Sequence, residues 1–132
     1  MSARTLTFLL ALPLLLAGCN KPDHESVMKG MVQEMERMLT VMKSIQDEAS
    51  SRAAASQIRD ITKNLQDYTK RAQTMQRPTA SEDKRLKEAY DPRIQKANAD
   101  MTAEARRIAS NPKLMTPELK SALQEMNTLK NR

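Results

Sequence analysis

The chain has 132 residues and a formal net charge of +6, with 29% charged and 2% aromatic residues. This length is that of one small domain, so we expect no second independent core. The positive excess is mild, and so few aromatic side chains leave nucleic-acid bases almost nothing to stack on, so we expect no nucleic-acid partner.

The first residues have the features of a bacterial export signal. Arg4 provides a positive start, and the apolar stretch from Leu6 to Leu16 is too short to span a bilayer as a stable anchor. The stretch ends in Leu16-Ala17-Gly18-Cys19. This motif resembles the lipobox of bacterial lipoproteins, in which small residues precede a cysteine. The resemblance implies that residues 1–18 are a cleaved signal peptide, that the Cys19 thiol carries a diacylglycerol, and that the new amino terminus is usually acylated.

The lipid on Cys19 would determine where the protein works, because two or three acyl chains hold a protein firmly on a membrane. By the same resemblance, an Asp after the cysteine would favour the inner membrane, and this chain has Asn20 there. We therefore expect an outer-membrane protein that faces the periplasm, with the inner membrane as the alternative. Residues 19–22 form a short tether. Cys19 is the only cysteine, which excludes an internal disulfide.

Residues 23–132 are predicted to form one all-α domain, since no stretch alternates between apolar and polar residues at a period of two. The first helix is predicted to start with Asp23 as its N-cap. Its apolar residues alternate at spacings of three and four, as in a heptad seam. They are Met28, Met31, Met35, Met38, Met42 and Ile45.

A second helix carries a similar seam, and its first member, Ile58, follows Ile45 by thirteen positions. In one straight helix this spacing would turn the second seam by about 220°, to the far side of the helix from the first. A turn near Ala49–Arg52 removes the conflict and predicts a helical hairpin. Arg77-Pro78 is expected to end the second helix. The seam consists of Ile58, Ile61, Leu65, Tyr68, Ala72 and Met75.

Thr79 and Glu82 have the spacing of a capping box and predict the start of a third helix. Pro92 interrupts that helix, which we expect to be kinked or split there. Pro112 closes it, and Thr116-Pro117-Glu118 opens a fourth. Antiparallel hairpins of four amphipathic helices with short links predict a four-helix up-down bundle. The last two seams are Leu86, Tyr90, Ile94, Ala97, Met101, Ala105 and Ile108, then Leu119, Leu123 and Met126.

The methionine seam of the first helix has three interpretations. Methionine fills cores flexibly and also forms adaptable partner-binding surfaces. Its thioether is a soft ligand for Cu(I) as well, although a copper site needs converging ligands rather than a line. His24, the only histidine, lies one turn before Met28 and shares its face. The candidate partner or metal surface is therefore His24, Met28, Met31, Met35, Met38 and Met42.

The predicted layout is similar to the haem-binding four-helix bundle of periplasmic b-type cytochromes, with Met28 near the position of their methionine ligand. Such cytochromes need a histidine on the last helix, and residues 121–132 contain none. The chain also lacks the Cys-x-x-Cys-His motif of covalent haem attachment. We therefore expect no cofactor other than the covalent lipid on Cys19.

Catalysis is not expected, because the sequence offers no histidine base within a core, no glycine-rich phosphate loop and no metal triad. The sequence predicts a noncatalytic, membrane-anchored periplasmic lipoprotein that binds another envelope protein as an interaction, assembly or structural factor. The alternative is binding of a soft metal such as copper, or of a small apolar ligand, through the methionine-rich first helix. Self-association is left open.

Overall fold

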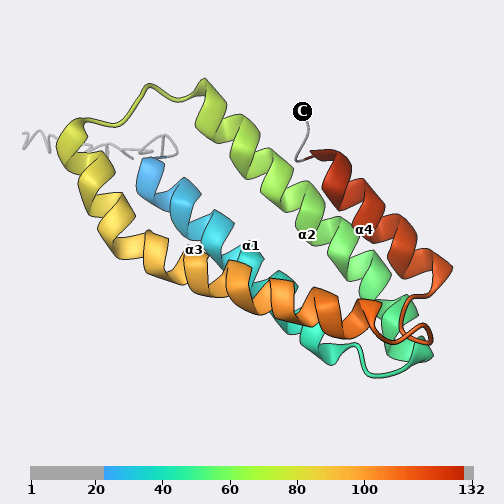
Figure 1. Ribbon diagram of the computed structural model, residues 1–132. Helices are drawn as coiled ribbons and strands as arrows, with labels where there is room; N and C mark the ends of the chain where they lie inside the picture. Colours follow the sequence, from blue (N-terminus) through green and yellow to red (C-terminus); the bar gives the residue numbers. More distant parts are fainter. Residues whose placement is uncertain (1–22, 130–132) are drawn as a thin grey trace, which may run out of the picture.

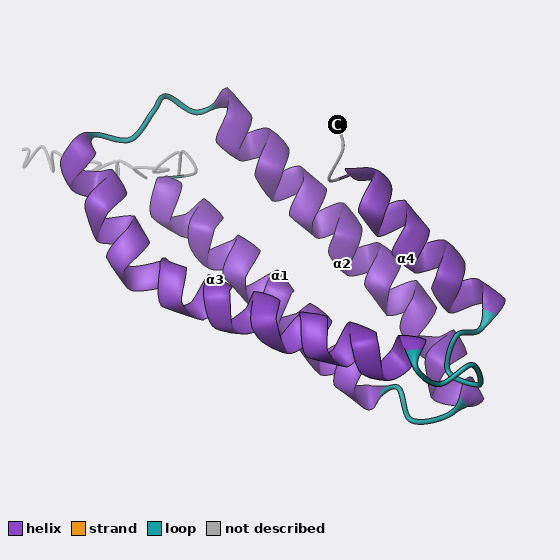
Figure 2. Cartoon of the chain, viewed as in Figure 1, coloured by secondary structure: helices purple, strands orange, loops and turns teal. Residues whose placement is uncertain are grey.

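The computed structural model describes residues 23–129, and all regular structure in this range is α-helical (Figure 1, Figure 2). The helices are α1 (His24–Ser44), α2 (Glu48–Thr74), α3 (Ala80–Ala109) and α4 (Pro117–Leu129). The predicted all-α class is thus confirmed for the described residues. The predicted signal peptide, the predicted lipidation site Cys19 and the predicted tether lie outside them.

Side-chain caps begin the helices where the sequence predicts them. The Asp23 carboxylate accepts a hydrogen bond from the Ser26 backbone N–H at 2.6 Å, and this bond lowers the pKa of Asp23. The Thr79 hydroxyl accepts from the Glu82 backbone N–H at 3.2 Å. Thr116 accepts in the same way from the first turn of α4, at 3.3 Å. Each bond satisfies an N–H group that the helix itself leaves free.

The first turn is not at Ala49–Arg52, where the sequence places it, but at residues 45–47. Asp47 is the N-cap of α2: its carboxylate accepts from the Ser50 backbone N–H at 2.7 Å, and the Ser50 hydroxyl accepts from the Asp47 N–H at 3.0 Å. This capping box starts the helix within the polar run, and the bonds from Ser50 lower the pKa of Asp47. The predicted hairpin is present, since α1 packs against α2.

The helices make close backbone contacts in the order α3, α1, α2, α4, and Figure 1 shows α3 beside α1 and α4 beside α2. An ion pair connects each outer helix to its inner neighbour. Arg93 of α3 lies 2.8 Å from Glu36 of α1, and Glu125 of α4 lies 3.0 Å from Arg59 of α2. Within the described range, α3 makes no close backbone contact with α2 or α4, and α4 makes none with α1. The predicted four-helix up-down bundle is therefore not confirmed.

Helix α3 runs through Pro92 without interruption, so the helix is not split there, and a kink stays a prediction. Proline lacks the N–H that would bond to the preceding turn. Packing on both sides compensates: Tyr90 is buried, and Ile94 packs on the same cluster against α1. Arg93 also donates to both carboxylate oxygens of Glu36. Contacts with α1 therefore hold the helix together on either side of the proline.

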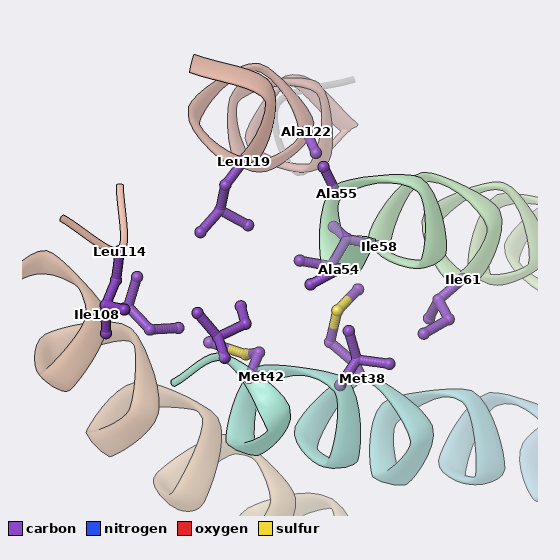
Figure 3. Packing of buried hydrophobic residues seen from close by; sticks show 12 residues of the cluster. Met38, Met42, Ala54, Ala55, Ile58, Ile61, Ile108, Leu114, Leu119 and Ala122 are labelled. Atoms are coloured by element: carbon purple, nitrogen blue, oxygen red, sulfur yellow. The ribbon is translucent and has the colours of Figure 1, made fainter. Parts of the chain in front are cut away.

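The larger core lies toward the end of the molecule where α1 turns into α2, and all four helices contribute to it (Figure 3). Met38 and Met42 of α1 are 1% and 3% exposed. They pack in one cluster with Ile58 of α2, Ile108 of α3 and Leu119 of α4. A smaller cluster of Val32, Leu86 and Tyr90 joins α1 to α3. Two of the predicted site methionines are therefore core residues.

Ser51, in the stretch that the sequence suggested as a turn, is fully buried. Its hydroxyl donates to the Leu114 carbonyl at 2.6 Å and lies 3.0 Å from the Thr116 hydroxyl. These bonds satisfy buried polar atoms that would otherwise destabilise the fold. They attach the start of α2 to the link between α3 and α4.

Candidate functional site

An apolar pocket of about 200 Å³ lies where the start of α1 meets the end of α2 and the start of α3. Val27 and Leu86 are buried in its wall, while Met28, Met31 and Met75 are half-buried. Apolar pockets with a few polar groups at the edge are the usual form of a small-ligand site. Its apolar lining consists of Val27, Met28, Met31, Ala72, Met75, Pro78 and Leu86.

His24 connects three segments that meet at this pocket. Its Nε2 lies 2.7 Å from the Gln76 carbonyl oxygen, and its Nδ1 lies 3.3 Å from a Glu82 carboxylate oxygen. Both partners are acceptors, so a ring with a proton on each nitrogen donates to both, whereas a neutral ring donates to one. His24 therefore joins α1 to the link after α2 and to the first turn of α3. The Glu82 side chain, which the sequence pairs with Thr79 by capping-box spacing, lies within hydrogen-bond distance of His24.

Charged side chains surround the apolar lining. Lys87 Nζ lies 2.7 Å from the Asp83 carboxylate, and this hydrogen bond raises the pKa of Lys87. Both residues line the pocket together with Asp91. The pocket thus combines an apolar interior with a polar edge on α3, a combination suited to a ligand with a long apolar part.

The structure does not bring the six predicted site residues together into one site. His24, Met28 and Met31 line the pocket. Met38 and Met42 are in the core, while Met35 is half-buried and does not line the pocket. Met75 does line it, although the sequence placed this residue only in the seam of the second helix. The predicted hairpin contains the signal for Met75. A hairpin brings the end of its second helix, where Met75 lies, to the start of its first helix, where Met28 lies.

A second, polar hollow of about 170 Å³, which was not predicted from the sequence, lies between α1 and α2. One oxygen of Glu34 is buried there without a hydrogen-bond partner and lies 3.5 Å from Arg37 Nη1. Arg71 stacks over the Tyr68 ring at 5.5 Å from its centroid. The lining is Glu34, Asn64, Asp67, Tyr68 and Arg71.

Gly30 makes room for the Tyr68 ring in this hollow. A methyl group on Gly30 would overlap the ring and lie 2.6 Å from the Tyr68 hydroxyl oxygen. Gly30 is itself buried in the middle of α1, where glycine is unfavourable for the helix by about 1 kcal/mol relative to alanine. The close approach of Tyr68 is the physical reason for a glycine at this position.

We expect Gly30→Ala to lower the free energy of unfolding by about 1 kcal/mol, because overpacking against Tyr68 exceeds the gain in helix propensity. In a Tyr68→Ala background the overlap is gone, so the same change should raise stability by about 1 kcal/mol. Urea unfolding of the four proteins measures both values. Equal stabilisation of both backgrounds would show that Tyr68 does not pack on Gly30.

Within residues 23–129, no three His, Cys, Asp or Glu side chains are grouped so as to hold a metal ion. None of the described helices is both long enough and apolar enough to cross a membrane. Comparisons of the chain with protein-family models, with curated proteins and with solved structures give no significant match.

Proposed function

We propose that this protein is a noncatalytic lipoprotein of the bacterial envelope, anchored through lipid on Cys19 to the outer membrane and facing the periplasm. Its helical domain binds or positions another envelope protein. The observation that carries the proposal is the sequence Leu16-Ala17-Gly18-Cys19 at the end of an apolar export segment. Asn20 supports the outer membrane, since it takes the place of the Asp that would favour inner-membrane retention.

The distance from the anchor to the folded part supports a role close to the membrane surface. Only Asn20, Lys21 and Pro22 lie between Cys19 and the cap of α1. The four steps along the chain from Cys19 to Asp23 span about 14 Å when fully extended, so the start of α1 stays near the lipid headgroups. A protein held in this way can meet partners in or on the same membrane.

Replacing Cys19 with serine is expected to move the protein from the membrane fraction to the soluble periplasmic fraction, because the serine hydroxyl is not a lipidation site. Mass spectrometry of the wild type should find acyl chains on an amino-terminal Cys19. Lys21→Ser, in the same tether, keeps the thiol and should remain membrane-bound. Equal membrane binding and equal processing of the serine variant would contradict the proposal.

The choice between outer and inner membrane is tested at Asn20. Asn20→Asp should shift the protein toward the inner membrane in density-gradient fractions.

The binding of another envelope protein needs a separate measurement. Crosslinking in native membranes, followed by mass spectrometry, should recover one envelope protein in constant proportion to the chain. Recovery of lipids alone would contradict the interaction role.

Soft-metal binding is the second candidate, because His24, Met28, Met31 and Met75 line one pocket. Three thioethers and an imidazole are suitable ligands for Cu(I). Both His24 nitrogens already face oxygen acceptors, so a metal would have to displace one of them. Anaerobic Cu(I) titration tests this candidate: binding lost in Met31→Leu but kept in a matched Met126→Leu variant would favour it.

A further inference from the structure

The apolar pocket is at the end of the helical domain that the tether reaches. His24 lines the pocket and is five residues after Cys19. A tether of four residues keeps Cys19 within about 14 Å of Asp23. Any acyl chain on Cys19 or on its amino group therefore starts within about 14 Å of Asp23, the residue before His24 of the pocket lining.

The lining matches a hydrocarbon chain better than a compact polar ligand. Val27 and Leu86 present aliphatic surface, and Met28, Met31 and Met75 present flexible thioether chains. Methionine adapts to ligands of irregular shape because it is unbranched and has several rotatable bonds. A dry apolar cavity of about 150 Å³ suffices to bind a benzene ring, so about 200 Å³ accommodates a short length of acyl chain.

The charged groups of the pocket lining fit a lipid whose headgroup stays outside the pocket and whose hydrocarbon chain enters it. Asp83 and Lys87 pair with one another, and His24 is bonded to Glu82 and Gln76. His24, Asp83 and Lys87 therefore have partners without a ligand headgroup. The hydrogen bond to Asp83 raises the pKa of Lys87, and the nearby charge of Asp91, the other carboxylate of the lining, adds to this effect. The polar part of the lipid would stay outside, at the tether, while the hydrocarbon enters between α1, α2 and α3.

We propose that one acyl chain of the lipid on Cys19 occupies this pocket instead of entering the bilayer. The inference rests on the proposed lipidation of Cys19. The lipobox resemblance implies up to three chains in all, and two chains are enough for stable anchoring. The protein would thus remain on the membrane while the third chain fixes the Met28 side of the domain against the lipid surface.

The experiment uses the full lipoprotein in native membranes, labelled in living cells with a photoreactive fatty acid. Illumination should produce a crosslink that joins the Cys19 peptide to a peptide containing Met28, Met31 or Met75, in the monomeric band of a denaturing gel. Ala72 is exposed and lines the pocket, so Ala72→Phe should fill the space and abolish this crosslink without disturbing the core. Ala53→Phe, at an exposed alanine of the same helix that does not line the pocket, should leave it unchanged.

A second variant, Ala72→Asp, adds a charge without bulk and should also remove the crosslink, while circular dichroism shows whether each variant keeps its helices. If Cys19 is acylated but its chains crosslink only to bilayer lipids, the inference is overturned and the proposed function stands. Pocket adducts with phospholipid alone would likewise overturn it. If Cys19 carries no acyl chain, the proposed function fails as well.

Discussion

Replacing Met38 with alanine is expected to lower the free energy of unfolding by about 2–5 kcal/mol, because it leaves a cavity in a packed core. Met38 is 1% exposed and packs in the cluster that contains Ile58 and Leu119. Met31→Ala, in the same seam, should cost only about 0.5–1 kcal/mol, because this side chain is half-exposed at the pocket. Urea unfolding of the two variants and the wild type measures the difference.

Met38→Leu is the matched control, since it nearly conserves volume and should cost less than about 1.5 kcal/mol. Equal losses for Met38→Ala and Met31→Ala would contradict the division of the seam into a core part and a pocket part. Met31→Ala also separates the stability of the fold from ligand binding. This variant should change how fully a ligand occupies the pocket, with little effect on the free energy of unfolding.

The seam pattern predicts which face of α1 is apolar, but not what covers each turn of it. Met28 and Met42 belong to the same stripe. Met42 is buried because α2, α3 and α4 contribute side chains around it. Met28 lies at the other end, where α2 stops and the pocket remains. Periodicity is a property of one helix, whereas burial depends on the lengths and positions of its neighbours.

Helix ends were predictable wherever a capping side chain was recognised, as at Asp23 and Thr79. The first turn lies before its predicted position because Asp47 and Ser50 bond to one another and start α2 within the polar run. Local chemistry of this kind is readable from spacing alone. The turn could therefore have been predicted correctly.

The neighbours of each helix were not readable in this way. Short links suggested that each helix packs against the next, yet α3 lies beside α1 and not beside α2. The choice depends on contacts between distant residues, such as the packing of Val32 of α1 with Leu86 and Tyr90 of α3. The exposed ion pair of Glu36 with Arg93, at 2.8 Å, adds to this contact. Opposite charges occur on every helix, so their pairing has no signature in a single sequence.

Arg107→Ala is expected to lower the free energy of unfolding by roughly 2 kcal/mol, because it removes charged hydrogen bonds to carbonyls at the end of α1. Arg107 Nη1 donates to the Ile45 carbonyl at 2.8 Å, and Nη2 donates to the Met42 carbonyl at 3.0 Å. Its Nε donates to Glu104 at 2.7 Å, which fixes the guanidinium in place. The last carbonyls of a helix lack the usual partner one turn further on. The Met42 carbonyl accepts from the Ile45 backbone N–H at 3.2 Å, and the donors from α3 add to this bond, so they stabilise both the helix end and the α1–α3 contact.

Two variants separate the hydrogen bonds from the charge. Arg106 is exposed in the same last turn of α3, so Arg106→Ala removes an equal charge from the helix terminus and should cost less than about 0.5 kcal/mol. Arg107→Lys keeps the charge but offers one ammonium group, which lacks the fork that reaches two carbonyls at once. Its stability should therefore lie between that of Arg107→Ala and the wild type. A loss for Arg106→Ala as large as that for Arg107→Ala would mean that terminal charge, rather than the bonds to Met42 and Ile45, joins α3 to the end of α1.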